Sequence, residues 1–321
     1  MIYVTCGEVR AAPEGMASSD GSSRPFMPDF FVQLQAEMVR ALPVRSLREK
    51  KAFATLSLDE QTWRFMNWQS RLVHPHPRQV NKAVGFDCLP EVRANRQRVD
   101  ALLGRIARGD DLSPHLSKRV CEGYRLRPPG RKDGPDFDLL LNEWGIHHLH
   151  IHPAPASSKE LLYAIFGRGV AFALAIAPHG VWTSRQFIAS ALQSWPNQGL
   201  FVPLNVAPGQ DPSANDHEAL RKAGMTIPVT HGDRVWLSGV TLGLTTALVS
   251  TRVSMEASRV LRCLRQATEA PDHLASQLMA VAALNHKSWP AQQVIGIRWL
   301  SGPDRYCFAF VEETSGATLL I

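Results

Sequence analysis

The fold is decided by residues 161–177, which read Leu161-Leu162-Tyr163-Ala164-Ile165-Phe166, then Gly167-Arg168-Gly169, then Val170-Ala171-Phe172-Ala173-Leu174-Ala175-Ile176-Ala177. Two apolar runs of strand length on either side of a short glycine-containing turn are typical of a β-hairpin. The second run ends at Pro178-His179-Gly180, and Thr183 with Gln186 then matches a helix start. We therefore expect two paired strands followed by a helix with an apolar face made of Phe187, Ile188, Ala191, Leu192 and Trp195.

Four histidines precede this hairpin, in the segment Gly145-Ile146-His147-His148-Leu149-His150-Ile151-His152. The alternating apolar residues favour a strand, on which successive side chains point to opposite faces. His148, His150 and His152 then share one face, about 6–7 Å apart along the strand, while His147 joins Leu149 and Ile151 on the other. If this strand lies beside the hairpin, His148 or His150 and His179 can converge on one edge of the sheet.

The remaining segments complete a prediction of an α+β fold. Residues 28–125 read as mostly helical, with helix starts at Ser46 and Ser57 and an apolar helical stripe from Val92 to Ile106 that ends at Gly109. We expect a small sheet packed on helices at 126–200 and an α+β accessory domain at 201–321. In that last third we expect helices at 213–222, 254–266 and 272–284, and strands at 234–237, 244–253, 294–300 and 306–312.

The composition is that of a globular protein. A chain of 321 residues with 45% hydrophobic residues can bury a sizeable core. Its five cysteines are far apart and form no C-x-x-C pair, which favours a reducing, cytoplasmic setting over a disulfide framework or a zinc ribbon. No apolar run is long enough to predict a membrane span. Residues 1–27, rich in Gly, Ser, Ala and Pro, are expected to be disordered or to precede the true start.

The positive charge is concentrated in one segment. Residues 91–132 hold eleven Arg or Lys and five Asp or Glu, an excess of six that equals the net charge of the whole chain. Such a zone predicts binding to a phosphate backbone, although a solvated helix face is the alternative. The residues expected to contact nucleic acid are Arg93, Arg96, Arg105 and Arg108 on the helix, with Arg131, Lys132, Arg168 and Arg185 as the charges nearest the histidines.

The histidines allow two kinds of catalysis. His148 and His150 form an H-x-H pair that can bind one divalent transition metal, with His152, His179 or Asp138 as a third ligand. Alternatively, His148, His150 and His179 can act without metal on RNA, one removing the proton of the 2′-hydroxyl and another protonating the leaving 5′-oxygen. In that case Arg or Lys stabilises the charge on the phosphate. The chain has no P-loop, H-E-x-x-H or G-x-S-x-G motif.

A third hypothesis is a non-enzymatic nucleic-acid or protein-binding module whose histidines are structural. Five tryptophans could stack on bases in such a module, although aromatic residues at helical spacing are more often part of a core. They are Trp63, Trp68, Trp144, Trp182 and Trp195.

The paired strands followed by Pro178-His179-Gly180 and a helix resemble the C-terminal half of RelE/YafQ/HigB-type toxins, over about 50 of the 321 residues. The resemblance implies a small sheet packed on helices and metal-independent cleavage of mRNA. His179 matches the acid–base residue, and His148 and His150 correspond loosely. Residues 139–150 also resemble proteins of bacterial mobile or defence islands. RNA is the expected partner, and the sequence leaves open whether a ribosome or an antitoxin takes part.

Overall fold

The computed structural model describes residues 4–5, 26, 29–44, 46–124, 137–154, 159–302 and 305–321. Helices and three small sheets among these residues confirm the α+β fold class. The contacts divide the chain into two compact units, one of residues 66–255 and one of residues 1–65 with 256–321. Their boundaries fall within α3 (Leu58–Ser70) and α10 (Thr251–Glu269).

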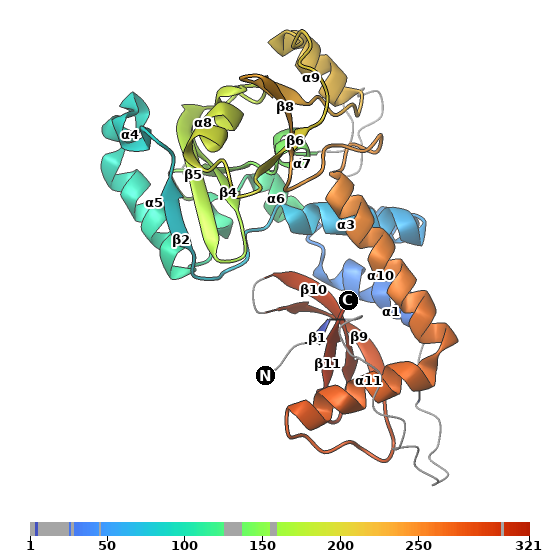
Figure 1. Cartoon of the computed structure of the whole chain (residues 1–321). Coiled ribbons are helices and arrows are strands. Elements are labelled where there is room, and N and C mark those ends of the chain that lie inside the picture. The colour runs from blue at the N-terminus through green and yellow to red at the C-terminus, as the bar shows by residue number, and fades with distance from the viewer. Residues whose placement is uncertain are drawn as a thin grey trace. The chain divides into compact units, whose positions relative to one another are not determined.

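The first unit is built on a four-stranded sheet that contains the predicted hairpin and histidine strand (Figure 1). Its strands are, in sheet order, β2 (Gln79–Lys82), β5 (Val170–Pro178), β4 (Glu160–Phe166) and β3 (His147–His150). β3, β4 and β5 are antiparallel neighbours, as expected. β2 lies in the region expected to be helical and pairs in parallel with β5, which joins that region to the sheet.

The two faces of this sheet pack against different helices. Leu149, Leu162 and Ile176 face a core made with α5 (Arg96–Arg108), which lies with α4 (Pro90–Ala94) on the side of β2 in Figure 1. The other face packs against α7 (Leu139–Trp144) and α8 (Gln186–Ser194). The pairing of β4 with β5 shifts between Tyr163 and Ala164, which leaves Leu174 of β5 as an extra residue without a directly opposed partner on β4. Such a bulge bends the strand locally.

Local signals explain where several helices begin and end. The backbone N–H groups of Glu49 and Glu60 bond the hydroxyls of Ser46 and Ser57, which confirms both predicted starts. The stripe from Val92 is not one helix, because the chain breaks at Asn95 between α4 and α5. α5 ends as predicted at Gly109, whose φ of +77° suits glycine. Ser113-Pro114 starts only a short 3₁₀ turn, and α6 (Lys118–Glu122) follows.

Gly145 fixes the turn between α7 and the histidine strand. Its φ is +76°, and an added Cβ would lie 2.7 Å from Cγ1 of Val240, so a larger residue fits neither the backbone nor the packing. The end of α7 is further held by Thr241, whose hydroxyl donates to the carbonyl of Glu143 at 2.5 Å, and by Ser238, whose hydroxyl donates to that of Trp144 at 3.2 Å. β3 therefore leaves α7 in a fixed direction.

The rest of this unit is a second sheet with a helix. Its strands are, in sheet order, β6 (Phe201–Leu204), β8 (Arg234–Ser238) and β7 (Val229–His231), and the helix is α9 (Ala214–Lys222). The strand expected at 244–253 is wrong. Leu244 and Ser250 form an isolated antiparallel bridge across a tight turn in which Leu248 has a φ of +65°, and α10 begins at Thr251.

The second unit has its own sheet of four described strands, in the order β1 (Val4–Thr5), β11 (Thr318–Leu320), β10 (Tyr306–Glu312) and β9 (Ile295–Ser301). The backbone of β1 pairs with β11, so the expectation of disorder is wrong for these two residues. Around the sheet lie α1 (Phe30–Ala41), α2 (Leu47–Ala54) and α11 (Pro271–Leu284). Phe30 packs edge-on against Phe310 with ring centroids 5.1 Å apart.

Candidate active site

The three candidate catalytic histidines converge. The ring centroid of His179 lies 5.3 Å from that of His150 and 6.4 Å from that of His148. The strand register explains this, because His150 pairs with Leu161 of β4, and Leu161 pairs with Ala177 of β5, two residues before His179. Since directly opposed residues point to the same face, His148 and His150 rise on one side of the sheet. The small Ala177 leaves room for the rings to approach.

An aromatic side chain closes one side of this cluster. The ring of Trp182 lies 5.0 Å from that of His148 and 5.6 Å from that of His179, measured between centroids. Beneath it, Tyr163 stacks on Phe187 at 4.4 Å and donates its hydroxyl to the carbonyl of Pro178 at 3.0 Å. The chain that carries His179 is thus held to the sheet at the residue before it.

Asp138 holds the other side of His148. Its carboxylate caps the start of α7 by accepting from the backbone N–H of Leu141 at 3.1 Å, and its Oδ2 lies 3.2 Å from Nδ1 of His148. Burial alone would raise the pKa of Asp138, but the charge and hydrogen bonding of His148, the Leu141 N–H and the charge of Arg71 together lower it to about 2. Asp138 therefore stays ionised and can stabilise a protonated His148.

His179 is in a different electrostatic environment. Burial against its neighbours lowers the pKa of His179, and the positive charge of His148 lowers it further. One histidine of the pair therefore has a carboxylate partner, and the other is biased toward its neutral form. This asymmetry is what acid–base catalysis by two imidazoles requires.

His147 points away from this cluster. It pairs with Ala164 on the opposite face and packs edge-on against Phe166, with ring centroids 5.2 Å apart. Burial lowers the pKa of His147 to about 4, so it is neutral at physiological pH. His147 is structural, in agreement with the predicted alternation of faces.

A cavity of about 560 Å³ opens beside His148 and His179. Four basic residues and two acidic residues line it together with Trp182, so its lining carries a net positive charge before any histidine is protonated. The basic residues are Arg71, Arg119, Arg221 and Lys222, and the acidic ones are Asp138 and Glu218. Of the basic residues, Lys222 pairs with Glu218 at 2.6 Å. A cavity of this kind suits an anionic ligand.

A buried ionic cluster lies at one side of the cavity. Glu143, only 1% exposed, accepts from Arg221, from the backbone N–H of Ile227 at 3.1 Å and from Nε2 of His217 at 3.2 Å. Arg221 also donates from Nη1 to the carbonyl of Trp182 at 2.6 Å and stacks on the ring of Trp144 at 4.6 Å. The cluster links α7, α9 and the segment of Trp182, all of which contribute residues to the lining of the cavity.

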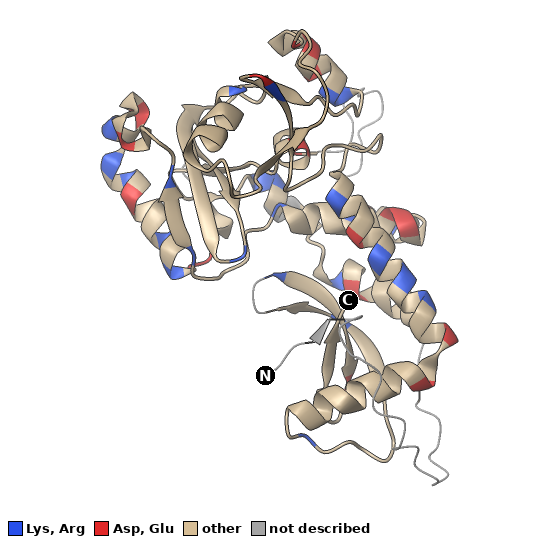
Figure 2. Ribbon diagram, in the orientation of Figure 1, with Lys and Arg blue, Asp and Glu red and all other residues tan. Residues whose placement is uncertain are grey.

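The predicted nucleic-acid contacts lie elsewhere. Arg93, Arg96, Arg105 and Arg108 are on α4 and α5, which pack against the face of the sheet opposite to His148. Figure 2 shows acidic residues among the basic ones on these helices. Arg96 bonds Asp87 at 2.9 Å and Asp100 at 2.8 Å, and Arg108 bonds Asp110 at 2.7 Å. Charge pairing therefore reduces the basic character expected of this surface.

The other four predicted contacts do not line the cavity within the described chain. Arg131 and Lys132 lie outside the described residues. Arg168 is in the turn of the hairpin, at the end of β4 and β5 far from His179. Arg185 forms an ion pair with Asp211 at 2.8 Å and donates a hydrogen bond to the carbonyl of Pro212 at 2.6 Å. The role of Arg168 and Arg185 as charge stabilisers beside the histidines therefore stays a prediction.

The alternative metal site was expected at His148, His150 and His152. β3 ends at His150, and His152 follows in a bend. Within the described ranges, no group of three or more His, Cys, Asp or Glu side chains is arranged to hold a metal ion. The structure thus groups His148 and His150 with His179 and Trp182 rather than with His152.

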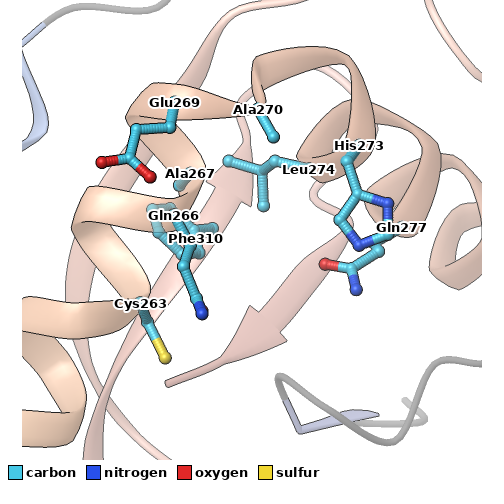
Figure 3. A pocket seen from close by; sticks show the side chains of 9 residues that line it. All are labelled: Cys263, Gln266, Ala267, Glu269, Ala270, His273, Leu274, Gln277 and Phe310. Atoms are coloured by element: carbon cyan, nitrogen blue, oxygen red, sulfur yellow. The ribbon is translucent and has the colours of Figure 1, made fainter.

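A second cavity, of about 430 Å³, lies in the other unit between α10, α11 and Phe310 of β10. Its chemically reactive side chains are Cys263 and His273, which Figure 3 shows on opposite sides of the pocket. Its lining is otherwise mainly apolar or amide, with Glu269 at the rim. The cavity beside His148 and His179 combines acid–base groups with a basic lining, and it is the candidate active site.

No protein-family model, curated protein or solved structure matches this chain. The resemblance to RelE/YafQ/HigB-type toxins therefore stays a prediction. Within the described part of the chain, every helix is too short or too polar to cross a lipid bilayer.

Proposed function

We propose that the protein cleaves RNA by metal-independent acid–base catalysis at the cavity beside His148 and His179. The observation that carries this proposal is the convergence of His148, His150 and His179, two of which, His148 and His179, line a cavity with a net positive lining. An RNA strand supplies a phosphodiester anion for the basic side chains. Beside it lies a 2′-hydroxyl that can give its proton to a neutral imidazole.

The roles follow from the surroundings of each ring. His179, whose pKa is lowered, is the general base that takes the proton of the 2′-hydroxyl. The 2′-oxygen then attacks phosphorus, the bond from phosphorus to the 5′-oxygen breaks, and protonated His148 gives its proton to that oxygen. The products are a 2′,3′-cyclic phosphate and a 5′-hydroxyl. Asp138 is a positioning residue that orients His148 and balances its charge.

The separation of the His148 and His179 rings agrees with their roles as acid and base. The attacking and leaving oxygens lie on opposite sides of phosphorus, so base and acid must approach from two directions, each within about 3 Å of its oxygen. Ring centroids 6.4 Å apart leave space for one phosphate group between His148 and His179. The ring of His150 lies beside the base, 5.3 Å from that of His179 between centroids.

The test is cleavage of single-stranded RNA by the full-length protein in EDTA, with the ends of the products identified. We expect 2′,3′-cyclic or 3′-phosphate ends and no cleavage of DNA, which lacks the 2′-hydroxyl. His179→Ala should lower the rate by about 10²- to 10⁴-fold, the usual effect of losing one general acid or base. The matched control is His231→Ala, because His231 is an exposed histidine of β7.

Other outcomes would redirect the proposal. Full activity of a folded His179→Ala protein would overturn it. RNA binding without cleavage by the parent protein would favour the non-enzymatic binding module. Cleavage that is lost in EDTA and restored by a transition metal would favour the metal-dependent hydrolase.

A further inference from the structure

The guanidinium of Arg221 is held in place on three sides. Nε bonds the carboxylate of Glu143, Nη1 bonds the carbonyl of Trp182 at 2.6 Å, and the ring of Trp144 lies 4.6 Å from the guanidinium carbon. Only 2% of the residue is exposed. Since a guanidinium is planar and its five N–H groups have fixed directions, these contacts also fix where the remaining donors point.

One nitrogen of this guanidinium is left without a partner. Nη2 of Arg221 is buried and makes no hydrogen bond with any residue that the structure describes. Buried polar atoms are nearly always hydrogen-bonded, and an unsatisfied charged donor costs more than a neutral one. Arg221 also lines the cavity that contains His148 and His179. A rigid, buried and unsatisfied cationic donor beside a cavity is an arrangement prepared for an anion.

The surroundings favour phosphate. Arg71, Arg119 and Lys222 line the same cavity, and Trp182, which accepts a hydrogen bond from Arg221, has its ring against both His148 and His179. The Arg221 donor is therefore connected to the candidate acid–base pair through a single residue. Nη2 carries two N–H groups and part of the positive charge, so it can make a charge-assisted hydrogen bond to a phosphoryl oxygen.

We infer that Arg221 forms the phosphate subsite of this cavity, in which Nη2 donates to a phosphoryl oxygen of the substrate. This assignment rests on the proposed function for the identity of the substrate, but binding of the phosphate group itself does not require cleavage. Glu143 and Trp144 keep the donor in position before the ligand arrives, so little conformational entropy is lost on binding.

The first test is a calorimetric titration of the full-length protein with inorganic phosphate, with trimethyl phosphate as the uncharged probe. We expect saturable binding of phosphate alone. Arg221→Lys keeps the positive charge but loses the fork, and it should weaken phosphate binding at least tenfold. The matched control is Arg93→Lys on α4, which should leave the affinity within twofold. Equal affinity for phosphate in folded Arg221→Lys protein would overturn the inference.

The second test does not depend on a variant, since Arg221→Lys disturbs a buried cluster and can fail to fold. Crystals of the parent protein soaked in tungstate, an anomalously scattering analogue of phosphate, should show a peak within hydrogen-bond distance of Nη2 of Arg221. A peak elsewhere in the cavity, or no peak at a concentration that saturates binding in solution, would overturn the assignment.

The two proposals can fail separately. Phosphate binding at Arg221 in a protein that leaves RNA intact would refute the ribonuclease and retain the subsite. RNA cleavage with an unchanged KM in folded Arg221→Lys protein would refute the subsite and retain the ribonuclease.

Discussion

Oδ2 of Asp138 lies 3.2 Å from Nδ1 of His148, and this contact leaves Nε2 of His148 as the nitrogen that can serve a substrate. Asp138→Asn keeps the size of the side chain and an oxygen that can cap α7, but removes the negative charge. We expect kcat to fall by about 10²- to 10⁴-fold, as when the carboxylate behind a catalytic histidine is neutralised, with little change in KM.

A purely structural role for Asp138 would lower stability as well as activity. A positioning role predicts that kcat falls in Asp138→Asn while KM and the free energy of unfolding stay close to those of the parent protein. Asp87→Asn, which changes an exposed carboxylate paired with Lys82 and Arg96, is the control. A loss of stability that accounts for the loss of activity would show that Asp138 merely caps the helix.

The acidic limb of the pH profile of kcat/KM reports on His179, because this ratio reflects the groups of the free enzyme. Because burial and the charge of His148 lower its pKa, His179 should lose its proton below the ordinary histidine value of about 6.5. The acidic limb of kcat/KM should therefore lie below that pH. Trp182→Ala removes the ring that packs against His179, admits water, and should shift the limb upward. A limb that stays in place in a folded Trp182→Ala protein would contradict the cause that we assign to the lowered pKa.

The parts of this site that could be predicted from the sequence are those encoded by local periodicity. The alternation of His148, Leu149 and His150 gives the faces of β3, and the glycine turn gives the hairpin that brings His179 beside them. Both signals act over a few residues. The convergence of the three histidines could therefore be predicted once the strands were taken as neighbours.

The basic lining of the cavity could not be predicted in this way. Arg71 follows α3 and Arg221 lies in α9, about 150 residues apart, and neither belongs to a recognisable motif. Arg221 reads as one more residue of a polar helix, and its burial depends on Glu143 and Trp144 from α7. The charge excess of residues 91–132 pointed instead to α5, because a count along the chain does not register that Asp87, Asp100 and Asp110 pair with those arginines.

The stability of the protein should depend on pH through His147. Its pKa is about 4 in the folded protein and about 6.5 when unfolded, so the unfolded chain binds more protons between these values. The free energy of unfolding is therefore not reduced by this group above pH 6.5. It falls by on the order of 3 kcal/mol as the pH drops toward 4. His147→Asn should lose correspondingly less stability between pH 7 and 4 in urea unfolding. Equal losses would mean that other groups dominate, and His231→Asn serves as the exposed control.

The buried cluster should be far more sensitive to substitution than a surface pair of the same chemistry. Glu143→Gln leaves Arg221 and His217 without their anionic partner, and we expect a loss of about 3–5 kcal/mol in the free energy of unfolding. Glu218→Gln, which breaks the exposed pair with Lys222, should cost about 0–1 kcal/mol. Comparable losses in the two variants would mean that the Glu143 cluster is not needed for the fold.

The salt dependence of binding distinguishes between the two surfaces that could bind RNA. Each phosphate that a side chain neutralises on a single strand contributes roughly −0.7 to the slope of log affinity against log salt. If RNA enters the cavity, Arg119→Ala and Lys222→Ala should each reduce this slope by up to that amount in the inactive His179→Ala background. Arg93→Ala and Arg108→Ala, on the helices at the opposite face of the sheet, should change it little, because neither side chain lines the cavity. The opposite result, with the slope reduced only by the variants on α4 and α5, would restore the surface expected from the charge count and remove the cavity as the site where RNA binds.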